Sequence, residues 1–407
     1  MNKVFYPLLI FILIMAASCN DPSPLEDEGR DLLEAYGEFR SDTLYAISDT
    51  FIVTGKVSTA FSQKLLLGSY AGFETRFLLQ FTTLPPDTIV MDSLKLLISS
   101  ASEYGTDNKT INGTVYRVKE PWEETVNNNP DWDYKNNIDY TPGTTAQFSF
   151  GELDTTLYTD FSINLPKELV EIWQDTTSGE QNYGVLLDFN SSGVIREFSS
   201  REGFFSSRRP RIVYVYHFAE NDSTIRDTVV ASRDASLIDF PGDFDQSKLF
   251  VTCGYTAHAF FQFNLDSIPK TASLSSASFY FSQDSANSII NTNKSQILYI
   301  RNVITEYDQL PSFEIDSSFV FSSLHNLVLR DVAGSGLQLE GQSRANAGQY
   351  VIQDILNDFV ENGSFFVQYA NEGEDISVYA IKDSKNPDIE LRPRLILEYF
   401  INPKGRL

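Results

Sequence analysis

The chain has 407 residues, with 31 Lys and Arg against 55 Asp and Glu, and a net charge of −24. A field of that sign repels phosphate backbones, so the composition argues against binding to nucleic acid. The only two cysteines, Cys19 and Cys253, can build neither a disulfide framework nor a cysteine-based zinc site.

The first residues have the order of an export signal. Lys3 gives a positive start, and the apolar run from Phe5 to Met15 is too short to span a bilayer. Ala16-Ala17-Ser18-Cys19 resembles a lipobox, at which signal peptidase II cuts before a cysteine that is then lipidated. We therefore expect a lipoprotein signal peptide at 1–18 and a membrane anchor on Cys19. The alternative is ordinary secretion, with cleavage near Ser18.

Residues 19–45 are expected to form an acidic tether, because proline and acid this dense cannot bury a core. In some Gram-negative lineages, acidic residues after the lipidated cysteine mark lipoproteins for surface display. Four residues fit that description: Asp21, Glu26, Asp27 and Glu28. The sequence thus favours an outer-membrane lipoprotein that faces the periplasm or the cell surface. The alternative is a solvated linker that carries no localisation signal.

Strand patterns dominate the rest of the chain. Ile212, Tyr214 and Tyr216 share one face of an alternating run, and the 31 Phe and 20 Tyr suit pleated, half-buried surfaces. Turn clusters such as Tyr104-Gly105-Thr106-Asp107-Asn108 separate the runs, and no βαβ rhythm occurs. These features predict an all-β protein made of antiparallel, jelly-roll-like β-sandwiches.

Two large landmarks occur twice. Arg209-Pro210-Arg211-Ile212 precedes Tyr216, and Arg392-Pro393-Arg394-Leu395 precedes Tyr399 at the same spacing, 183 residues later. Phe77 to Phe81 is similarly echoed by Ala259 to Phe263. A constant offset indicates a duplicated unit. We predict module 1 at 46–218, module 2 at 224–402 and a short link, Ala219 to Ser223, with Asp49 to Val53 and Asp227 to Ala231 as matching opening strands.

Each copy also carries one helical pattern, expected to pack across an end or edge of its sandwich. In the first copy, Asn164 can cap a turn after which Leu169, Ile172 and Trp173 share a face. In the second, the same spacing joins Ile352, Ile355, Leu356 and Phe359, before Asn362-Gly363 ends the helix.

Three segments of the first copy carry a family resemblance: Trp122-Glu123-Glu124, Phe198-Ser199-Ser200-Arg201-Glu202 and the closing Arg-Pro-Arg strand. Together they resemble the DNRLRE domain, a β-sandwich related to the carbohydrate-binding modules of extracellular polysaccharide-degrading proteins. The resemblance covers nearly all of module 1. Module 2 is a divergent copy, with Tyr307-Asp308 and Ile381-Lys382-Asp383-Ser384 at the matching places. The resemblance implies a binding module rather than a catalyst.

The candidate ligand-binding residues lie in the first copy, which holds all three tryptophans: Trp132, Trp122, Glu123, Asp131, Asp133 and Arg201. Sugar binding needs flat apolar faces with polar edges, and Trp132 between two aspartates is the best exposed platform. A place in the core is the alternative for all three tryptophans, and it is favoured for Trp122 and Trp173, since aromatic side chains bury large areas. Arg201 either holds the carboxylate of a uronic acid or forms an ordering ion pair with Glu202.

A calcium site is a weaker interpretation. Its oxygen ligands would come from Asp131, Asp133 and Asp139, or from Asp239, Asp243 and Asp245. Neither set has the spacing of an EF-hand, so solvated acidic loops are the alternative.

No sequence motif indicates catalysis. His217, His258 and His325 stand in neither an H-E-x-x-H nor a nucleophile-elbow context. A glycosidase needs only two carboxylates at the right separation, and nothing singles out such a pair. We therefore expect a non-enzymatic lipoprotein that binds polysaccharide or surface glycan. The alternative is a structural, adhesion or assembly lipoprotein that contacts a partner protein.

Overall fold

The computed structural model describes most of the chain from residue 38 to residue 401. The described residues are 38–105, 110–129, 131–154, 158–175, 181–191, 193–240, 244–290, 297–303, 327–332, 336–341, 347–358, 364–369 and 372–401. The predictions for the signal peptide, for Cys19 and for most of the tether fall outside these residues, as do those for Tyr307-Asp308 and Phe359. Within them, no helix is long and apolar enough to cross a membrane.

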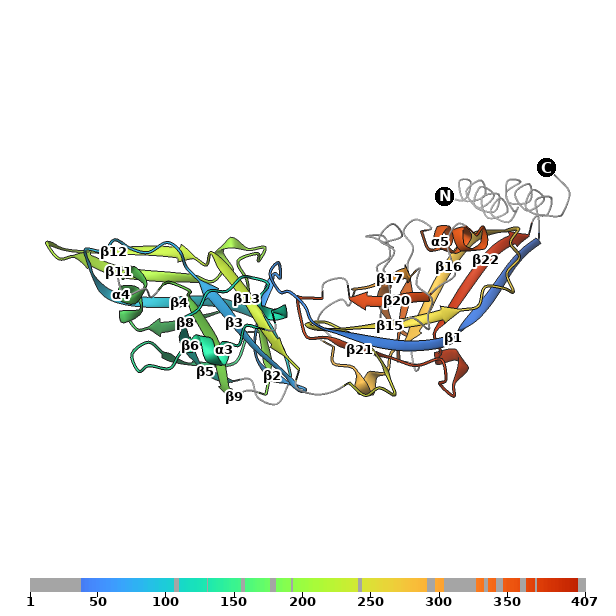
Figure 1. Ribbon diagram of the computed structural model, residues 1–407, viewed down its shortest axis with the longest axis horizontal. Helices are drawn as coiled ribbons and strands as arrows, with labels where there is room; N and C mark the ends of the chain where they lie inside the picture. The colour runs from blue at the N-terminus through green and yellow to red at the C-terminus, as the bar shows by residue number, and fades with distance from the viewer. Residues whose placement is uncertain are drawn as a thin grey trace, which may run out of the picture.

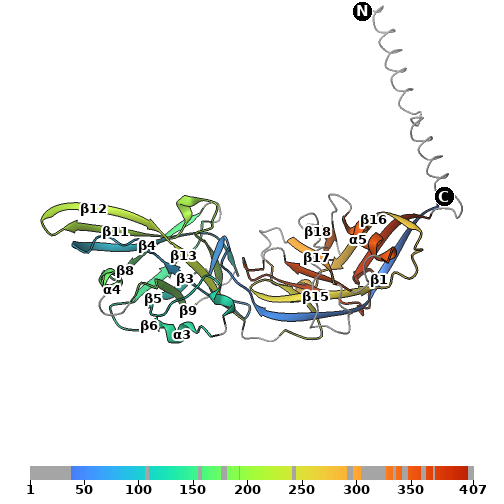
Figure 2. The same cartoon turned by 45° about the horizontal axis from the view of Figure 1, so that its top comes forward.

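The described strands form two lobes that lie end to end (Figures 1 and 2). The first lobe contains β2 (Lys64–Tyr70), β3 (Phe73–Gln80), β4 (Ile89–Tyr104), β5 (Ile111–Val118), β6 (Ile138–Asp139), β7 (Ala146–Phe150), β8 (Thr159–Leu165), β9 (Val185–Ser191), β10 (Ile195–Ser199), β11 (Arg211–Phe218), β12 (Asn221–Val230) and β13 (Arg233–Asp239). The second contains β1 (Glu38–Lys56), β14 (Leu249–Thr252), β15 (Tyr255–Phe263), β16 (Ala272–Ser282), β17 (Ile297–Val303), β18 (Leu327–Val332), β19 (Gly336–Gly341), β20 (Ser364–Tyr369), β21 (Val378–Ile381) and β22 (Arg394–Ile401).

Every ladder between these strands is antiparallel, so the predicted all-β class is confirmed. The first lobe is one 12-stranded sheet with the main order β12-β11-β4-β10-β2-β3-β9-β5-β6. In the second lobe, eight strands close on themselves in the order β1-β15-β20-β17-β18-β19-β16-β22, and β14 pairs with β21 beside them.

Three α-helices occur among the described residues: α3 (Tyr134–Asn137) and α4 (Glu168–Gln174) in the first lobe and α5 (Ala347–Leu356) in the second. The predicted helix around Leu169 corresponds to α4, which buries Leu169, Val170 and Trp173. Its N-cap is Lys167, not Asn164. Ile352, Ile355 and Leu356 of the other predicted helix are buried in α5. The short helix α3 has no counterpart among the predictions.

The first strand of each sequence copy lies in the lobe built by the other copy. β1 precedes the first lobe in the chain but pairs with β22 and β15 of the second lobe. β12 and β13 precede the rest of the second lobe but pair with β11 and β3 of the first. The two copies have therefore exchanged their opening strands.

The exchanged strands sit in matching registers. Tyr45 pairs with Arg394, and Val230, which follows Tyr45 by 185 residues, pairs with the equivalent arginine, Arg211. Thr50 pairs with Phe260, and Ala235, again 185 residues later, pairs with Leu78. The continuous β1 is thus equivalent to β12 and β13 together.

This exchange corrects the predicted domain boundaries. Modules at 46–218 and 224–402 do not match the lobes, because their opening strands are exchanged. The predicted link Ala219 to Ser223 is part of the β11–β12 hairpin. The predicted tether ends too late, since Glu38 to Tyr45 pair with β22. The opening strands align at an offset of 185, so Asp49 is equivalent to Asp234 rather than to Asp227.

The repeated Arg-Pro-Arg segment closes the same turn in both lobes. Arg209 Nε donates to the carbonyl of Gly203 at 3.2 Å, and Arg392 Nε donates to that of Asn386 at 2.7 Å. In each case the acceptor lies six residues earlier. Arg211 and Arg394 likewise donate to carbonyls four residues earlier. The motif that reveals the duplication is therefore structural.

The exchanged strands also make the same side-chain hydrogen bonds in both lobes. Tyr216 Oη donates to Asp227 at 2.6 Å, and Tyr399 Oη donates to Asp42 at 2.5 Å. Asp234 accepts the backbone N–H of Arg201, and its equivalent Asp49 accepts that of Ser384. Both copies of the opening strand thus make equivalent contacts with the lobe that they join.

One apolar core crosses the boundary between the lobes. The buried core of the second lobe includes five buried side chains from the first: Leu66, Phe73, Tyr104, Ile195 and Ile238. Tyr104 Oη also lies 3.3 Å from Ser377 Oγ of the second lobe. Fully burying a large apolar side chain stabilises by roughly 1.5–3 kcal/mol, so this contact holds the lobes together firmly.

The strand exchange predicts which fragment of the chain folds. Residues 57–240 contain every strand of the first lobe, whereas residues 38–218 lack β12 and β13 and carry an unpaired β1. We expect fragment 57–240 to unfold cooperatively on heating and fragment 38–218 to do so weakly or not at all. Circular dichroism melting would compare them, and a peptide of residues 221–240 should restore the fold of 38–218. An equally cooperative 38–218 on its own would contradict the exchange.

Candidate functional site

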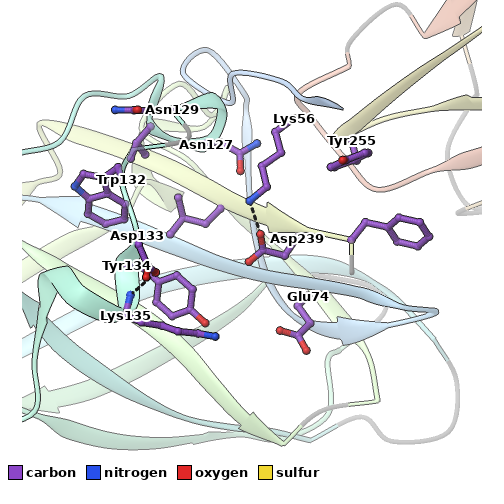
Figure 3. A pocket seen from close by; sticks show the side chains of 13 residues that line it. Lys56, Glu74, Asn127, Asn129, Trp132, Asp133, Tyr134, Lys135, Asp239 and Tyr255 are labelled. Atoms are coloured by element: carbon purple, nitrogen blue, oxygen red, sulfur yellow. Dashed lines mark hydrogen bonds and ion pairs between the residues drawn. The ribbon is translucent and has the colours of Figure 1, made fainter. Parts of the chain in front are cut away.

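A cleft of about 680 Å³ opens where the two lobes meet. Its walls come from the end of β1, from the loop with η1 (Val126–Asn128) and α3, from the end of β13 and from the start of β15. In Figure 3, Trp132 and Tyr134 lie on one side, Tyr255 lies on the other, and Lys56 and Asp239 meet between them. Both halves of the chain therefore contribute to one site.

Trp132 is held in place by its own loop. Its indole Nε1 donates to the carbonyl of Pro121 at 3.2 Å, and the side chain is half-buried, so part of the ring remains accessible. Asp133 caps α3 by accepting the backbone N–H of Lys135 at 3.0 Å. The cap fixes the direction of the chain after Trp132 and turns Tyr134 toward the same cleft.

The loop is fastened to both exchanged strands by Asn127. This buried amide donates to the carbonyl of Val57, just after β1, at 2.6 Å. It also accepts the backbone N–H of Ile238 in β13 at 2.7 Å. The position of Trp132 thus depends on the place where the two strands come together.

Arg76 supports the floor of the cleft. Its side chain is buried and pairs with Asp188 at 2.6 Å, with Glu74 at 3.0 Å and with Asp239 at 3.5 Å. Burial alone would lower the pKa of Arg76, but Asp188 and Glu74 hold that pKa above its ordinary value. The ring of Tyr134 covers the guanidinium at 4.6 Å, a cation–π contact.

Lys56 and Tyr134 add two further polar groups to the cleft. Asp239 also pairs with Lys56 at the end of β1. Burial raises the pKa of Tyr134 to about 12, so this phenol stays protonated and can donate a hydrogen bond at neutral pH. The cleft therefore combines aromatic faces with donors and acceptors at their edges.

The other two tryptophans belong to the core. Trp122 is 5% exposed, packs with Leu78 and Val118, and donates its indole N–H to the carbonyl of Tyr183 at 2.8 Å. Trp173 is 4% exposed within the core of the first lobe. Trp122 is thus part of the buried core, and its ring is not available to stack on a ligand. Its neighbour Glu123 is exposed, lies 3.6 Å from Arg233 and does not line the cleft.

Arg201 lies in an internal ion-pair cluster away from the cleft. Its guanidinium Nε is 3.2 Å from Glu124 and 2.5 Å from Glu202, and its Nη1 donates to the carbonyl of Ser232. The fully buried Asp234 accepts its backbone N–H at 2.6 Å. Burial, together with the nearby charges of Glu202 and Glu124, raises the pKa of Asp234 to about 7.

Asp131, Asp133 and Asp139, the first set considered for calcium, do not form a group that could hold a metal ion. Asp139 accepts hydrogen bonds from Arg117 at 2.8 Å and from Thr141 at 2.6 Å, and although burial opposes its charge, these bonds lower its pKa to about 2. Asp133 caps α3, and Asp131 is exposed. Asp243 lies outside the described residues. Among the residues that the structure does describe, no group of three potential ligands could hold a metal.

Sequence reasoning found part of the cleft. Trp132 and Asp133 were expected at a binding site, while Tyr134, Lys56, Glu74 and Tyr255 were not. Tyr134 comes two residues after Trp132, so the sequence could have predicted that it lies at the same site. No local pattern connects the other three to Trp132: Glu74 comes from β3 of the same lobe, and Lys56 and Tyr255 come from β1 and β15 of the second lobe.

One exposed aromatic pair lies outside the cleft. Phe204 and Phe205 are 85% and 52% exposed on the turn that Arg209 closes. The equivalent turn of the second lobe has Pro387 and Asp388 at these places and keeps the same arginine hydrogen bond. The turn itself therefore does not require phenylalanine.

No family model matches this sequence, and no curated protein is significantly similar to it. The resemblance to the DNRLRE domain accordingly stays a prediction.

The buried Asp234 predicts a pH-dependent stability. Because its pKa is raised from 3.8 to about 7, the folded protein holds a proton between about pH 4 and pH 7 that the unfolded chain releases. The free energy of unfolding should therefore fall as pH rises through this window. Asp234→Asn keeps an acceptor oxygen and should make the slope shallower by up to about 1.4 kcal/mol per pH unit.

Urea unfolding at pH 4.5, 5.5, 6.5 and 7.5 would measure both slopes. Asp87→Asn, at an exposed aspartate, is the control and should leave the wild-type slope unchanged. Equal slopes for wild type and Asp234→Asn would show that Asp234 does not hold the proton.

Proposed function

We propose that the protein binds a glycan, without cleaving it, in the cleft between its lobes. The observation that carries the proposal is the combination of Trp132, Tyr134 and Tyr255 with polar side chains around one cleft. Sugar rings present flat C–H faces that stack on aromatic rings, and their hydroxyl groups need donors and acceptors at the rim. The resemblance of the first copy to carbohydrate-binding modules supports the same conclusion.

The firm junction of the lobes also favours binding. The shared apolar core limits relative movement of the two walls, so little ordering is needed when a ligand enters. A preorganised site loses less entropy on binding than a mobile one.

The carboxylates of the cleft favour binding over hydrolysis. Glu74 pairs with Arg76, Asp239 pairs with Lys56, and Asp133 caps α3. A glycosidase needs one carboxyl group that holds a proton and a second that is free to attack or to activate water. Each carboxylate here is engaged with a cation or an N–H group, an arrangement that suits a ligand's hydroxyl donors better.

The test is binding to polysaccharides by affinity electrophoresis with wild type, Trp132→Ala and Trp132→Phe. We expect at least one neutral polysaccharide to retard the wild type, Trp132→Ala to lose about tenfold in affinity, and Trp132→Phe to keep part of it, because a ring remains for stacking. Incubation should release no new reducing ends.

Phe204→Ala is the matched control, since it removes an exposed aromatic ring outside the cleft. It should bind as wild type does. Failure of every polysaccharide to retard the wild type would end the proposal. Loss of binding in Phe204→Ala with full binding in Trp132→Ala would move the contact to the turn.

We further propose that the protein is an outer-membrane lipoprotein anchored through Cys19, on the basis of the lipobox-like segment before that cysteine. Expressed with its signal peptide in a Gram-negative host, the wild type should incorporate labelled palmitate and fractionate with the outer membrane. Cys19→Ala should lose the label and become soluble. Equal labelling of both would refute the assignment of Cys19.

A further inference from the structure

We infer that the cleft selects uncharged glycans and rejects those with uronic acid residues. This inference rests on the proposed function and adds the chemical class of the ligand. It follows from the charges that line the cleft and from the ion pairs that Lys56 and Arg76 already form there.

The ionised groups at the wall of the cleft are predominantly negative. Three carboxylates, Glu74, Asp133 and Asp239, face two ammonium groups, Lys56 and Lys135. The whole protein adds a field of the same sign, with a net charge of −24. A ligand carboxylate would therefore enter a region of negative potential.

Two of the three cations at or beneath the described wall of the cleft are already paired with carboxylates. Lys56 is paired with Asp239, and the buried Arg76 beneath the wall is surrounded by Glu74, Asp188 and Asp239. The ammonium group of Lys135 lies 5.7 Å from the centre of the Tyr134 ring. Uronate recognition needs an arginine or lysine directed at the ligand. Lys56 and Arg76 are held by carboxylates, which leaves the single ammonium group of Lys135 among three carboxylates at the wall.

Neutral sugars carry no charge, so the carboxylates of the cleft do not repel them and they need no cation as a partner. Their hydroxyl groups can donate to the carboxylate oxygens of Glu74 and Asp239, and hydrogen bonds to charged acceptors are stronger than those between neutral groups. The aromatic side chains supply the apolar faces. The same carboxylates thus serve as acceptors for a neutral ligand and as a barrier to a charged one.

The experiment compares matched pairs of probes on the full mature chain. Xyloglucan, galactomannan and mixed-linkage glucan are each used before and after oxidation of primary alcohols at C6 to carboxylates. Affinity is measured at 20 mM and at 500 mM NaCl. We expect the oxidised form of the preferred polysaccharide to bind about tenfold or more weakly at low salt, and the difference to shrink at high salt because exposed charges are screened.

A charge-removing variant locates the barrier. Glu74 is part of the cleft and half exposed, so Glu74→Gln should preserve the fold while reducing the ratio between the two affinities about threefold. The ratio is the readout, because a general loss of binding cancels in it. Glu168→Gln is the control: it makes the same charge change on an exposed face of α4, away from the cleft, and should leave the ratio unaltered.

The outcomes separate the two levels of the proposal. If the neutral form binds and the oxidised form binds at least as well, the charge selection is wrong while glycan binding stands. If Glu74→Gln and Glu168→Gln change the ratio equally, the barrier is not in the cleft. If neither form of any polysaccharide binds, glycan binding fails and the selection fails with it.

Discussion

The structure depends on where β1 forms its backbone hydrogen bonds. Over 19 residues, this strand pairs first with β22 and then with β15, so it belongs wholly to the lobe that the end of the chain builds. A strand edge left without partners would expose its N–H and C=O groups. In the first lobe, β12 and β13 pair instead with β11 and β3, at the positions equivalent to those of β1 in the second lobe. The two exchanged strands end close together at the junction, where Lys56 pairs with Asp239.

The candidate site is a product of that junction. Asn127 binds the backbone just beyond β1 and within β13, and in doing so it positions the loop that carries Trp132 and Tyr134. Lys56 and Asp239, the last residues of the two exchanged strands, meet in the cleft itself. A lobe that kept its own opening strand would still have a tryptophan, but it would lack the facing wall with Tyr255.

Sequence patterns predicted the all-β class of the fold, but not where the opening strands pair. Alternation in segments such as Ile212 to Tyr216 marks strands, and the two Arg-Pro-Arg segments mark equivalent turns. The opening strand, however, meets equivalent partners in both lobes: Arg211 and Arg394 have the same role, and so do Tyr216 and Tyr399. Which lobe the opening strand joins depends on tertiary packing, so no local sequence rule could have assigned it. For the same reason, the sequence did not predict that Lys56 and Tyr255 line the cleft. Trp132 was singled out because it stands between two aspartates.

The path of β1 has a mechanical consequence. The strand begins at the far end of the second lobe and runs to the junction with the first lobe, as Figure 1 shows. Its last residue, Lys56, lines the cleft. A pull between the beginning of the chain and a ligand in the cleft would run along the strand axis. The hydrogen bonds to β22 and β15 would then be loaded in shear and would have to break together rather than one by one.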